Sequence, residues 1–166
     1  METLENIIEL LKLKPHPEGG FYRETYRSEG IISDRCLGPE YSGSRNHSTC
    51  IYYLLNNDAF SSFHKIVQDE IWHYYDGSPV ALQMITPLGY HIEVIVGRDF
   101  SKGQVPQYVI PGGTWFAAKP LEAESYSLFG CTVAPGFTFA DFKQGDREEL
   151  LQLFPQYRDL ILEYTR

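Results

Sequence analysis

Residues 63–77 read FHKIVQDEIWHYYDG, a short stretch dense in aromatic rings, acids and histidines. Its β-branched and aromatic residues favour strands over a helix, and the closing Asp76–Gly77 pair is typical of a turn. We therefore expect a β-hairpin whose turn lies at residues 67–69. Side chains alternate along a strand, so His64 of the first strand and Glu70 of the second are expected close together on one face.

The same pattern extends through the middle of the chain. Segments of this kind run in order as TCIYYLL, AFSSFHKIV, EIWHYYDG, PVALQMITP, YHIEVIVG, QYVIPGG and SYSLFGCTVAPGF. Each is short and bounded by Gly, Pro, Asn or Asp, and no helical pattern separates them. Together they predict an all-β sandwich, barrel or jelly roll of about nine strands. Residues 28–46, rich in Ser, Gly and charge, are expected to form a loop.

Helical patterns lie only at the two ends of the chain. Thr3 can cap a first helix, which ends before Pro15. Asp146 predicts the start of a second helix, and Pro155 can open a third at its first turn. No repeat or linker divides the sequence, so we expect residues 1–166 to form a single domain.

The composition excludes several classes of partner. The chain has 166 residues, a formal net charge of −8 and a pI near 5.1. Such a surface repels phosphate backbones and anionic lipid headgroups, so we expect neither a nucleic acid nor a membrane as a partner. The N-terminal stretch METLENIIELLKLK lacks the basic start and continuous apolar run of a secretion signal, and the three cysteines show no C-x-x-C spacing. We therefore expect a cytoplasmic protein with free thiols.

Three residues of the opening stretch stand at the spacing of a known motif. His64, Glu70 and Gly77 match the first cupin motif, which runs His-x-His, three or four residues, Glu, six residues, Gly. Residues 111–116, PGGTWF, resemble the second cupin motif. Together with HPEGGFYRETYRS, STCIYYLL, VIPGGTW and GCTVAPGFTF, they make nearly the whole chain similar to the Cupin-5 group of the cupin superfamily. The resemblance implies an RmlC-like double-stranded β-helix, or jelly roll, with an N-terminal helix and C-terminal helices here, and a homodimer.

The resemblance also bears on metal binding. Metal-binding cupins hold their ion with His, His, Glu and His, but Ile66 and Phe116 stand at two of these positions here. His64 and Glu70 remain, and two protein ligands rarely hold a transition metal firmly. His73 lies three residues from Glu70 and is expected to face away. We therefore expect no cofactor, or at most a divalent metal held weakly by His64 and Glu70.

His64 and Glu70 can act instead as a catalytic pair. A carboxylate that is hydrogen-bonded to an imidazole fixes its tautomer and raises its pKa, which makes the imidazole a better base near neutral pH. Trp72 and Tyr74 share a face with Glu70 and would form an aromatic wall against a sugar ring or a carbonyl substrate. The resemblance points to His64 as well, because nucleotide-sugar epimerases of the RmlC-like branch use a barrel-lining histidine as base. The alternative is a hydrogen bond that only satisfies two buried polar groups.

A second candidate set surrounds a glycine pair. Glu18 precedes Gly19–Gly20, a turn that lets the backbone approach a ligand closely, and Arg23 could clamp a carboxylate or a phosphate. The alternative is a hairpin turn followed by an edge strand with solvated charges. Trp115 is included as a ligand-binding residue because the second cupin motif lines the barrel.

These residues predict a protein that binds a small molecule of sugar or carbonyl type inside the barrel, with acid–base chemistry of the epimerase or isomerase type. Two alternatives stay open beside this enzyme. One is a metal-dependent cupin enzyme, and the other is a non-catalytic ligand-binding or storage-like cupin. The sequence alone does not separate them, because the pocket depends on the paths of loops.

Overall fold

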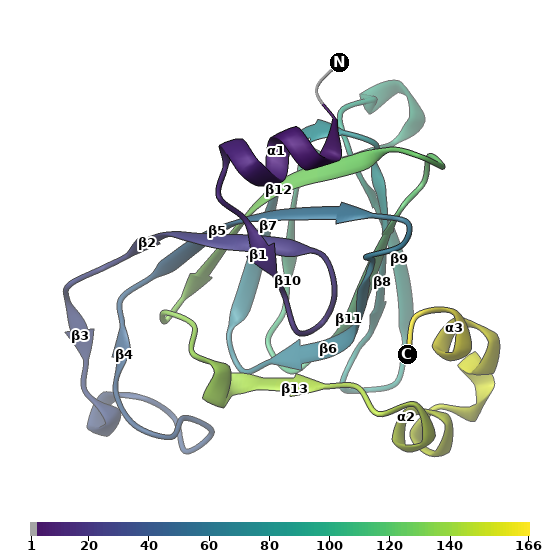
Figure 1. The fold of residues 1–166 in the computed structure, drawn as a ribbon. Coiled ribbons are helices and arrows are strands. Elements are labelled where there is room, and N and C mark those ends of the chain that lie inside the picture. The colour runs from purple at the N-terminus through teal and green to yellow at the C-terminus, as the bar shows by residue number, and fades with distance from the viewer. Residues whose placement is uncertain (1–2) are drawn as a thin grey trace.

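The structure, a computed structural model, describes residues 3–166. Two antiparallel sheets face each other around the core (Figure 1). From edge to edge, the six-stranded sheet contains β1 (Lys14–Pro15), β2 (Phe21–Arg27), β5 (Thr49–Asn56), β12 (Tyr126–Ala134), β7 (Asp69–Gly77) and β10 (Gln107–Ile110). The five-stranded sheet contains β13 (Phe142–Gln144), β6 (Ser61–Ile66), β11 (Trp115–Pro120), β8 (Val80–Ile85) and β9 (His91–Val96). This architecture confirms the predicted all-β jelly roll with helices at both ends.

The described residues contain thirteen strands, more than the nine that were expected. The difference comes from four strands of two or three residues: β1, β13, β3 (Ile31–Ile32) and β4 (Arg45–Asn46). The pair β3–β4 forms a small sheet of its own within segment 28–46, which was expected to be a loop. Figure 1 shows this pair extending away from the barrel at the lower left.

The strands β6 and β7 follow each other in sequence but do not pair. β6 pairs with β11 and β13, whereas β7 pairs with β12 and β10 in the other sheet. The predicted hairpin is therefore wrong, because the chain turns a corner between the sheets at residues 67–68. Gly112 packs against this corner, where a Cβ atom would lie 2.2 Å from the carbonyl oxygen of Val67. Alternation fixes the face of a side chain but not its partner strand, so His64 and Glu70 still both point inward.

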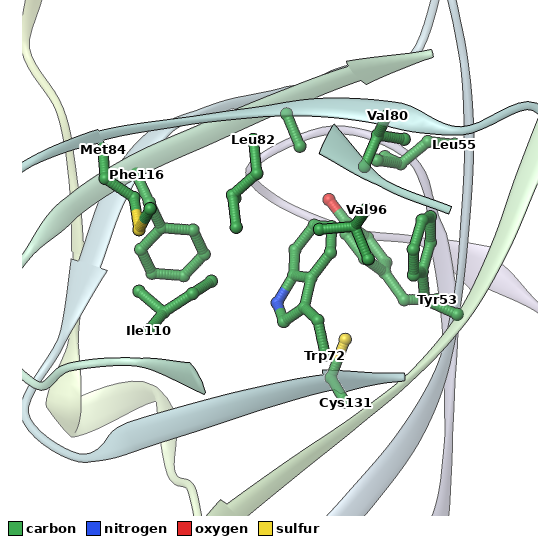
Figure 2. Packing of buried hydrophobic residues seen from close by; sticks show 12 residues of the cluster. Tyr53, Leu55, Trp72, Val80, Leu82, Met84, Val96, Ile110, Phe116 and Cys131 are labelled. Carbon is green, nitrogen blue, oxygen red and sulfur yellow. The ribbon is translucent and has the colours of Figure 1, made fainter. Parts of the chain in front are cut away.

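Apolar side chains fill much of the space between the sheets. Figure 2 shows the indole of Trp72 in this cluster, with the sulfur of Cys131 close beside it. The buried members are Tyr53, Leu55, Trp72, Val80, Leu82, Met84, Val96, Ile110, Phe116, Ala118, Phe129 and Cys131. Burial of this much apolar surface is the main force that holds the two sheets together.

Helices cover the outer faces of both sheets. α1 (Leu4–Leu10) begins at the predicted cap Thr3 and buries Ile7 against the six-stranded sheet. α2 (Arg147–Leu153) and α3 (Arg158–Glu163) pack on the five-stranded sheet around a cluster of Phe63, Ile85, Trp115, Ala117, Leu150, Ile161 and Tyr164. Among the described residues, no helix has the length and apolar character needed to cross a membrane.

Candidate active site

A cavity of about 250 Å³ opens between the two sheets at one end of the barrel. It lies where β7 begins and β12 ends, beyond the apolar cluster. Its ionisable or hydroxyl-bearing lining residues are Lys14, His16, Glu18, Tyr22, Glu24, Arg27, Thr49, Tyr53, His64, Glu70, Cys131 and Thr138. Its apolar lining residues are Ile51, Ile66, Val133, Phe137, Phe139 and Phe142. A small enclosed space with several convergent polar groups is the usual form of a ligand site.

The turn between β1 and β2 brings His16 and Glu18 into this cavity. The backbone N–H of His16 donates to Gly20 at 2.9 Å, and the N–H of Gly19 donates back to His16 at 3.0 Å. Both glycines have positive φ, +115° and +74°, and a Cβ atom on Gly19 would lie 2.0 Å from the carbonyl oxygen of Phe60. Only glycine fits such a conformation at so close an approach.

Glu18 and His64 form an ion pair at the inner wall. Glu18 Oε2 lies 2.9 Å from His64 Nε2, and the hydroxyl of Ser61 donates to Glu18 Oε1 at 3.1 Å. His64 Nδ1 lies 2.8 Å from the carbonyl oxygen of Ser62, which can only accept a hydrogen bond. Both ring nitrogens therefore face acceptors, and this arrangement requires the imidazolium form of His64.

The surroundings of this pair shift both titrations. Burial acts most strongly on His64 and lowers its pKa, but the charge and hydrogen bond of Glu18 outweigh burial, so the pKa of His64 is raised. Burial would raise the pKa of Glu18, yet the attraction of His64 and His16 brings that pKa down to about 2. Both shifts favour the charged forms of the pair, an imidazolium and a carboxylate.

Glu70 occupies the other side of the cavity in a different state. Its Oε1 accepts a hydrogen bond of 2.9 Å from the indole N–H of Trp72. Burial, reinforced by the negative charge of Glu18, raises the pKa of Glu70 to about 7. The thiol of Cys131 lies against this carboxyl group, and burial together with Glu70 keeps the pKa of that thiol well above its usual value. Near neutral pH, Glu70 is therefore able both to accept and to release a proton.

His16 is a cavity residue that was not singled out in the sequence. Its side chain is 8% exposed, and Nδ1 accepts a hydrogen bond of 3.3 Å from the backbone N–H of Glu18. Burial lowers the pKa of His16 despite the opposing charge of Glu18. The signal that could have found it is its place two residues before Glu18 in the motif HPEGG, on the same side of the turn.

Three of the predicted site residues line the cavity: Glu18, His64 and Glu70. Their pairing differs from the prediction, since Glu18 and not Glu70 binds the imidazole of His64. Glu70 still acts on His64 through its charge, which helps to raise the pKa of His64. Glu18 binds His64 because the glycine pair lets the backbone of the turn pack against the beginning of β6.

Two predicted aromatic wall residues lie outside the cavity lining. Trp72 is fully buried in the apolar cluster, where it serves Glu70 as a hydrogen-bond donor (Figure 2). Tyr74 packs against Phe129, and its hydroxyl donates to the carbonyl of Gly77. Both share a strand face with Glu70, but each step of two residues moves a side chain further from the open end.

The remaining predicted ligand residues also lie elsewhere. Arg23 lies with its guanidinium 5.5 Å from the ring of Tyr52, outside the lining of the cavity. Trp115 is buried under the C-terminal helices, with Lys65 and Lys143 over its ring. Alternation along β11 turns Trp115 outward because its neighbour Phe116 fills the interior.

The cavity residues do not fit a transition-metal centre. Within residues 3–166, no group of three or more His, Cys, Asp or Glu side chains is arranged to hold an ion. Both nitrogens of His64 are engaged by Ser62 and Glu18. Phe116 fills a position where metal-binding cupins carry a ligand, with its ring centroid 4.0 Å from that of His64.

The mouth of the cavity is held together by Arg27. Its guanidinium donates to both oxygens of Glu24 at 2.9 and 2.8 Å, to Asn46 Oδ1 at 2.8 Å and to the carbonyl of Phe137 at 2.9 Å. These bonds connect β2 and β4 to the segment that follows β12. Phe139 of that segment lines the cavity and is about half exposed, which marks the opening to solvent.

The far end of the described chain also contacts this site. Arg166 donates to the carbonyl of Glu18 at 2.7 Å, to the hydroxyl of Ser62 at 2.5 Å and to the carbonyl of Phe60 at 2.7 Å. The guanidinium thereby connects the turn that carries Glu18 to the strand that carries His64.

Comparisons with known proteins agree with this fold. Residues 5–145 match the family model Cupin_5, described as Cupin superfamily (DUF985). The uncharacterised protein YML079W of Saccharomyces cerevisiae is 34% identical over 157 residues, which cover 88% of this chain and 78% of the yeast protein.

Two solved structures are similar over their whole length. Protein SO0799 from Shewanella oneidensis has 35% identity and a TM-score of 0.89, covering 100% of this chain and 99% of that one. A hypothetical protein from Leishmania major has 32% identity and a TM-score of 0.89, with 99% of each chain covered.

Proposed function

The chain belongs to the Cupin_5 family of the cupin superfamily, and we propose that it is a proton-transfer enzyme of the isomerase or epimerase type acting on a small carbonyl or sugar-like compound. Cupin folds house varied enzymes and binding proteins, so the proposal depends on the site and not on the fold. The observation that carries it is a cavity of about 250 Å³ in which one carboxyl group, Glu70, faces a fixed pair of opposite charges, Glu18 and His64.

Glu70 is the base in this proposal. Its carboxylate takes a proton from a carbon next to a carbonyl group, and the electron pair of the broken C–H bond moves toward the carbonyl oxygen. The proton then returns from Glu70 to carbon, and no oxidant, reductant or metal takes part. A pKa of about 7 supports this role, since a base and its conjugate acid are then both present at neutral pH.

In this proposal His64 is not the base that the sequence suggested, and it supports Glu70 instead. Its two N–H groups are held by Ser62 and Glu18, which leaves neither nitrogen free to take a proton from a substrate. Its positive charge lies close enough to Glu70 to stabilise the carboxylate form. Trp72 orients the same carboxylate through its indole N–H.

The test measures exchange of carbon-bound hydrogen with solvent. Purified protein is incubated in D₂O with free pentoses and hexoses, hydroxyacetone, dihydroxyacetone, glyceraldehyde and nucleotide sugars, and the loss of C–H signals is followed by proton NMR. The wild-type protein should exchange one class of these compounds. Glu70→Gln should lower that rate by about 100-fold or more, as expected when a general base is removed.

Glu9→Gln is the matched control, because Glu9 is an exposed carboxylate on α1, away from the cavity. It should leave the exchange rate unchanged. Equal rates for Glu70→Gln and the wild type would remove Glu70 as the base. Binding of a probe with no exchange of its hydrogens would instead favour a ligand-binding cupin.

A further inference from the structure

The imidazole of His16 is held in place by aromatic rings on several sides. Its ring centroid lies 4.5 Å from that of Tyr22, 5.7 Å from Tyr53, 5.9 Å from Phe139 and 6.2 Å from Phe142. Three of these contacts are edge-on, the arrangement that aromatic pairs prefer. The ring is therefore fixed in one orientation within the cavity lining.

The tautomer of His16 follows from its hydrogen bonds. Nδ1 accepts from the backbone N–H of Glu18 at 3.3 Å, so Nδ1 carries the lone pair. In the neutral ring, the hydrogen must then sit on Nε2. His16 is consequently a hydrogen-bond donor through Nε2.

No side chain or backbone group among residues 3–166 accepts a hydrogen bond from this Nε2–H, and His16 lines the cavity, so the donor is open to a molecule inside it. Nearly all buried donors in proteins have a partner, from the protein, from water or from a ligand. The hydroxyl of Thr138, a second lining residue, is buried without a partner in the described chain. The donor of His16 that is open to the cavity can therefore be used by an oxygen atom of a bound molecule.

We propose that His16 is a catalytic residue that donates its Nε2–H to a substrate oxygen, and that the substrate is a small 2-hydroxycarbonyl compound, such as a free aldose or ketose. This inference rests on the proposed function and names its substrate class. A 2-hydroxycarbonyl compound presents two neighbouring oxygens beside the carbon whose hydrogen Glu70 removes.

The step balances without a further reactant. Glu70 takes the proton from C2, the C–H electron pair forms the C1–C2 double bond, and the carbonyl electrons move onto O1. The Nε2 proton of His16 passes to O1, and Nε2 then takes the proton of the O2 hydroxyl. Re-formation of a carbonyl at C2 draws the proton from Glu70 onto C1, so an aldose becomes a ketose and both side chains are restored.

The charges around Glu70 favour an uncharged reacting end. Glu18 is ionised. Of the Lys and Arg side chains that line the cavity, Arg27 already has its donors engaged by Glu24, Asn46 and Phe137, and the ammonium group of Lys14 lies 5.1 Å from the ring centroid of Tyr22. An anionic group brought next to Glu70 would meet two carboxylates without a free guanidinium. Sugars and short hydroxycarbonyl compounds meet these conditions.

Two substitutions separate a catalytic role from a structural one. His16→Asn places an acceptor near the position of Nδ1, so it keeps the bond to the Glu18 N–H but loses the donor at Nε2. His16→Gln places an N–H near the position of Nε2 and gives up the bond to Glu18. His47→Asn is the matched control, because His47 is exposed and lies outside the cavity.

The first measurement is the exchange rate in D₂O with dihydroxyacetone and glyceraldehyde. His16→Asn should lower it by about 100-fold or more, the loss expected when one donor to a developing oxyanion is removed. His16→Gln should retain more activity than His16→Asn, and His47→Asn should match the wild type. A wild-type rate in His16→Asn, or a higher rate in His16→Asn than in His16→Gln, would show that His16 only holds the turn.

The second measurement does not require turnover. Long-range ¹H–¹⁵N NMR should show the Nε2–H tautomer of His16 in the wild-type protein, and adding either probe should shift that nitrogen while His47 stays unchanged. An Nδ1–H tautomer, or no shift with either probe, would overturn the inference. If the wild type exchanges no compound at all, the proposed function fails, and this shift alone still decides whether His16 donates to a hydroxycarbonyl ligand.

Discussion

The buried ion pair Arg45–Asp141 and the buried pair His64–Glu18 use their hydrogen-bonding groups differently. Arg45 and Asp141 are 3% and 6% exposed, and His64 and Glu18 are 2% and 5% exposed. Arg45 donates to both oxygens of Asp141 at 2.8 and 2.5 Å and to three carbonyls of residues 42–44. Burial alone therefore does not distinguish the two pairs.

The difference lies in what surrounds them. Asp141 also accepts a hydrogen bond of 2.7 Å from Gln68, so both carboxylate oxygens of the first pair are bonded by protein donors. The second pair borders a cavity in which Glu70 has a pKa near neutrality and His16 has a donor without a protein acceptor. Charges whose own hydrogen-bonding atoms are all bonded hold the corner between the sheets in place, whereas charges that line a cavity with a titrating carboxyl group are available to a ligand.

The two pairs also differ in how they respond when one partner is lost. An arginine cannot release its proton at any ordinary pH, but a histidine can. Removing a partner therefore leaves an uncompensated charge at one site and a neutral imidazole at the other.

Arg45→Met should destabilise the protein most. The substitution leaves Asp141 buried without its cation, which typically costs about 3–5 kcal/mol of the free energy of unfolding. Urea unfolding at pH 7 measures the loss. The double variant Arg45→Met/Asp141→Leu should recover most of it, because the uncompensated charge is gone. If the double variant is no more stable than Arg45→Met, packing and not charge holds this site together.

Glu70 should make stability fall as the pH rises from about 4.5 to 7. Its pKa is 4.5 as a free group and about 7 in the folded protein, so the folded state holds the proton more tightly in this window. The fall should be on the order of 3 kcal/mol, by linkage between protonation and folding. Urea unfolding across this range measures it, and Glu70→Gln should have a flatter profile. Identical slopes for the two proteins would contradict the raised pKa.

Glu18→Gln should have a smaller effect on stability than Arg45→Met. At pH 7 the loss should be about 1–2 kcal/mol, because His64 can become neutral and so avoids remaining as an unpaired charge. The pKa of His64, followed by NMR, should fall, since the attraction of Glu18 no longer offsets burial. The pKa of Glu70 should fall as well, because the charge of Glu18 helps to raise it. An unchanged His64 titration would argue against the ion pair.

Ser61→Ala should have the smallest effect. It removes one hydrogen bond of 3.1 Å to Glu18 Oε1, worth about 1 kcal/mol. The pKa of Glu18 should rise slightly from about 2, and the acid limb of the stability profile should move to higher pH. Ser101→Ala is the control, because Ser101 binds an exposed carboxylate, Asp99. A shift as large in the control would mean that the Ser61 bond has no special weight.

The sequence predicted the jelly roll because alternation and turn residues are local signals. Alternation also placed His64 and Glu70 on inward faces. It could not assign β6 and β7 to different sheets, since partner choice depends on contacts between distant segments. The structure therefore contains neither the predicted hairpin nor the hydrogen bond between His64 and Glu70 that depended on it.

The sequence also did not predict how deep each side chain lies in the barrel. Glu70, Trp72 and Tyr74 share a face, but only Glu70 reaches the open end. Trp72 lies one step further in, where apolar groups surround it. Glu18 was identified because its glycine pair suggested a close approach, whereas His16, two residues earlier on the same turn, was not considered together with it. The contacts of Glu18 and His16 depend on how the turn between β1 and β2 packs against the barrel, and the local sequence does not encode this packing.

The hydrogen bonds of Arg166 have a practical consequence for handling this protein. Its guanidinium lies 4.3 Å from the ring of Phe60 and bonds the backbone on both sides of the Glu18–His64 pair. Assays of catalysis therefore need a protein in which this arginine is present and unmodified, because the backbone around the Glu18–His64 pair depends on its hydrogen bonds.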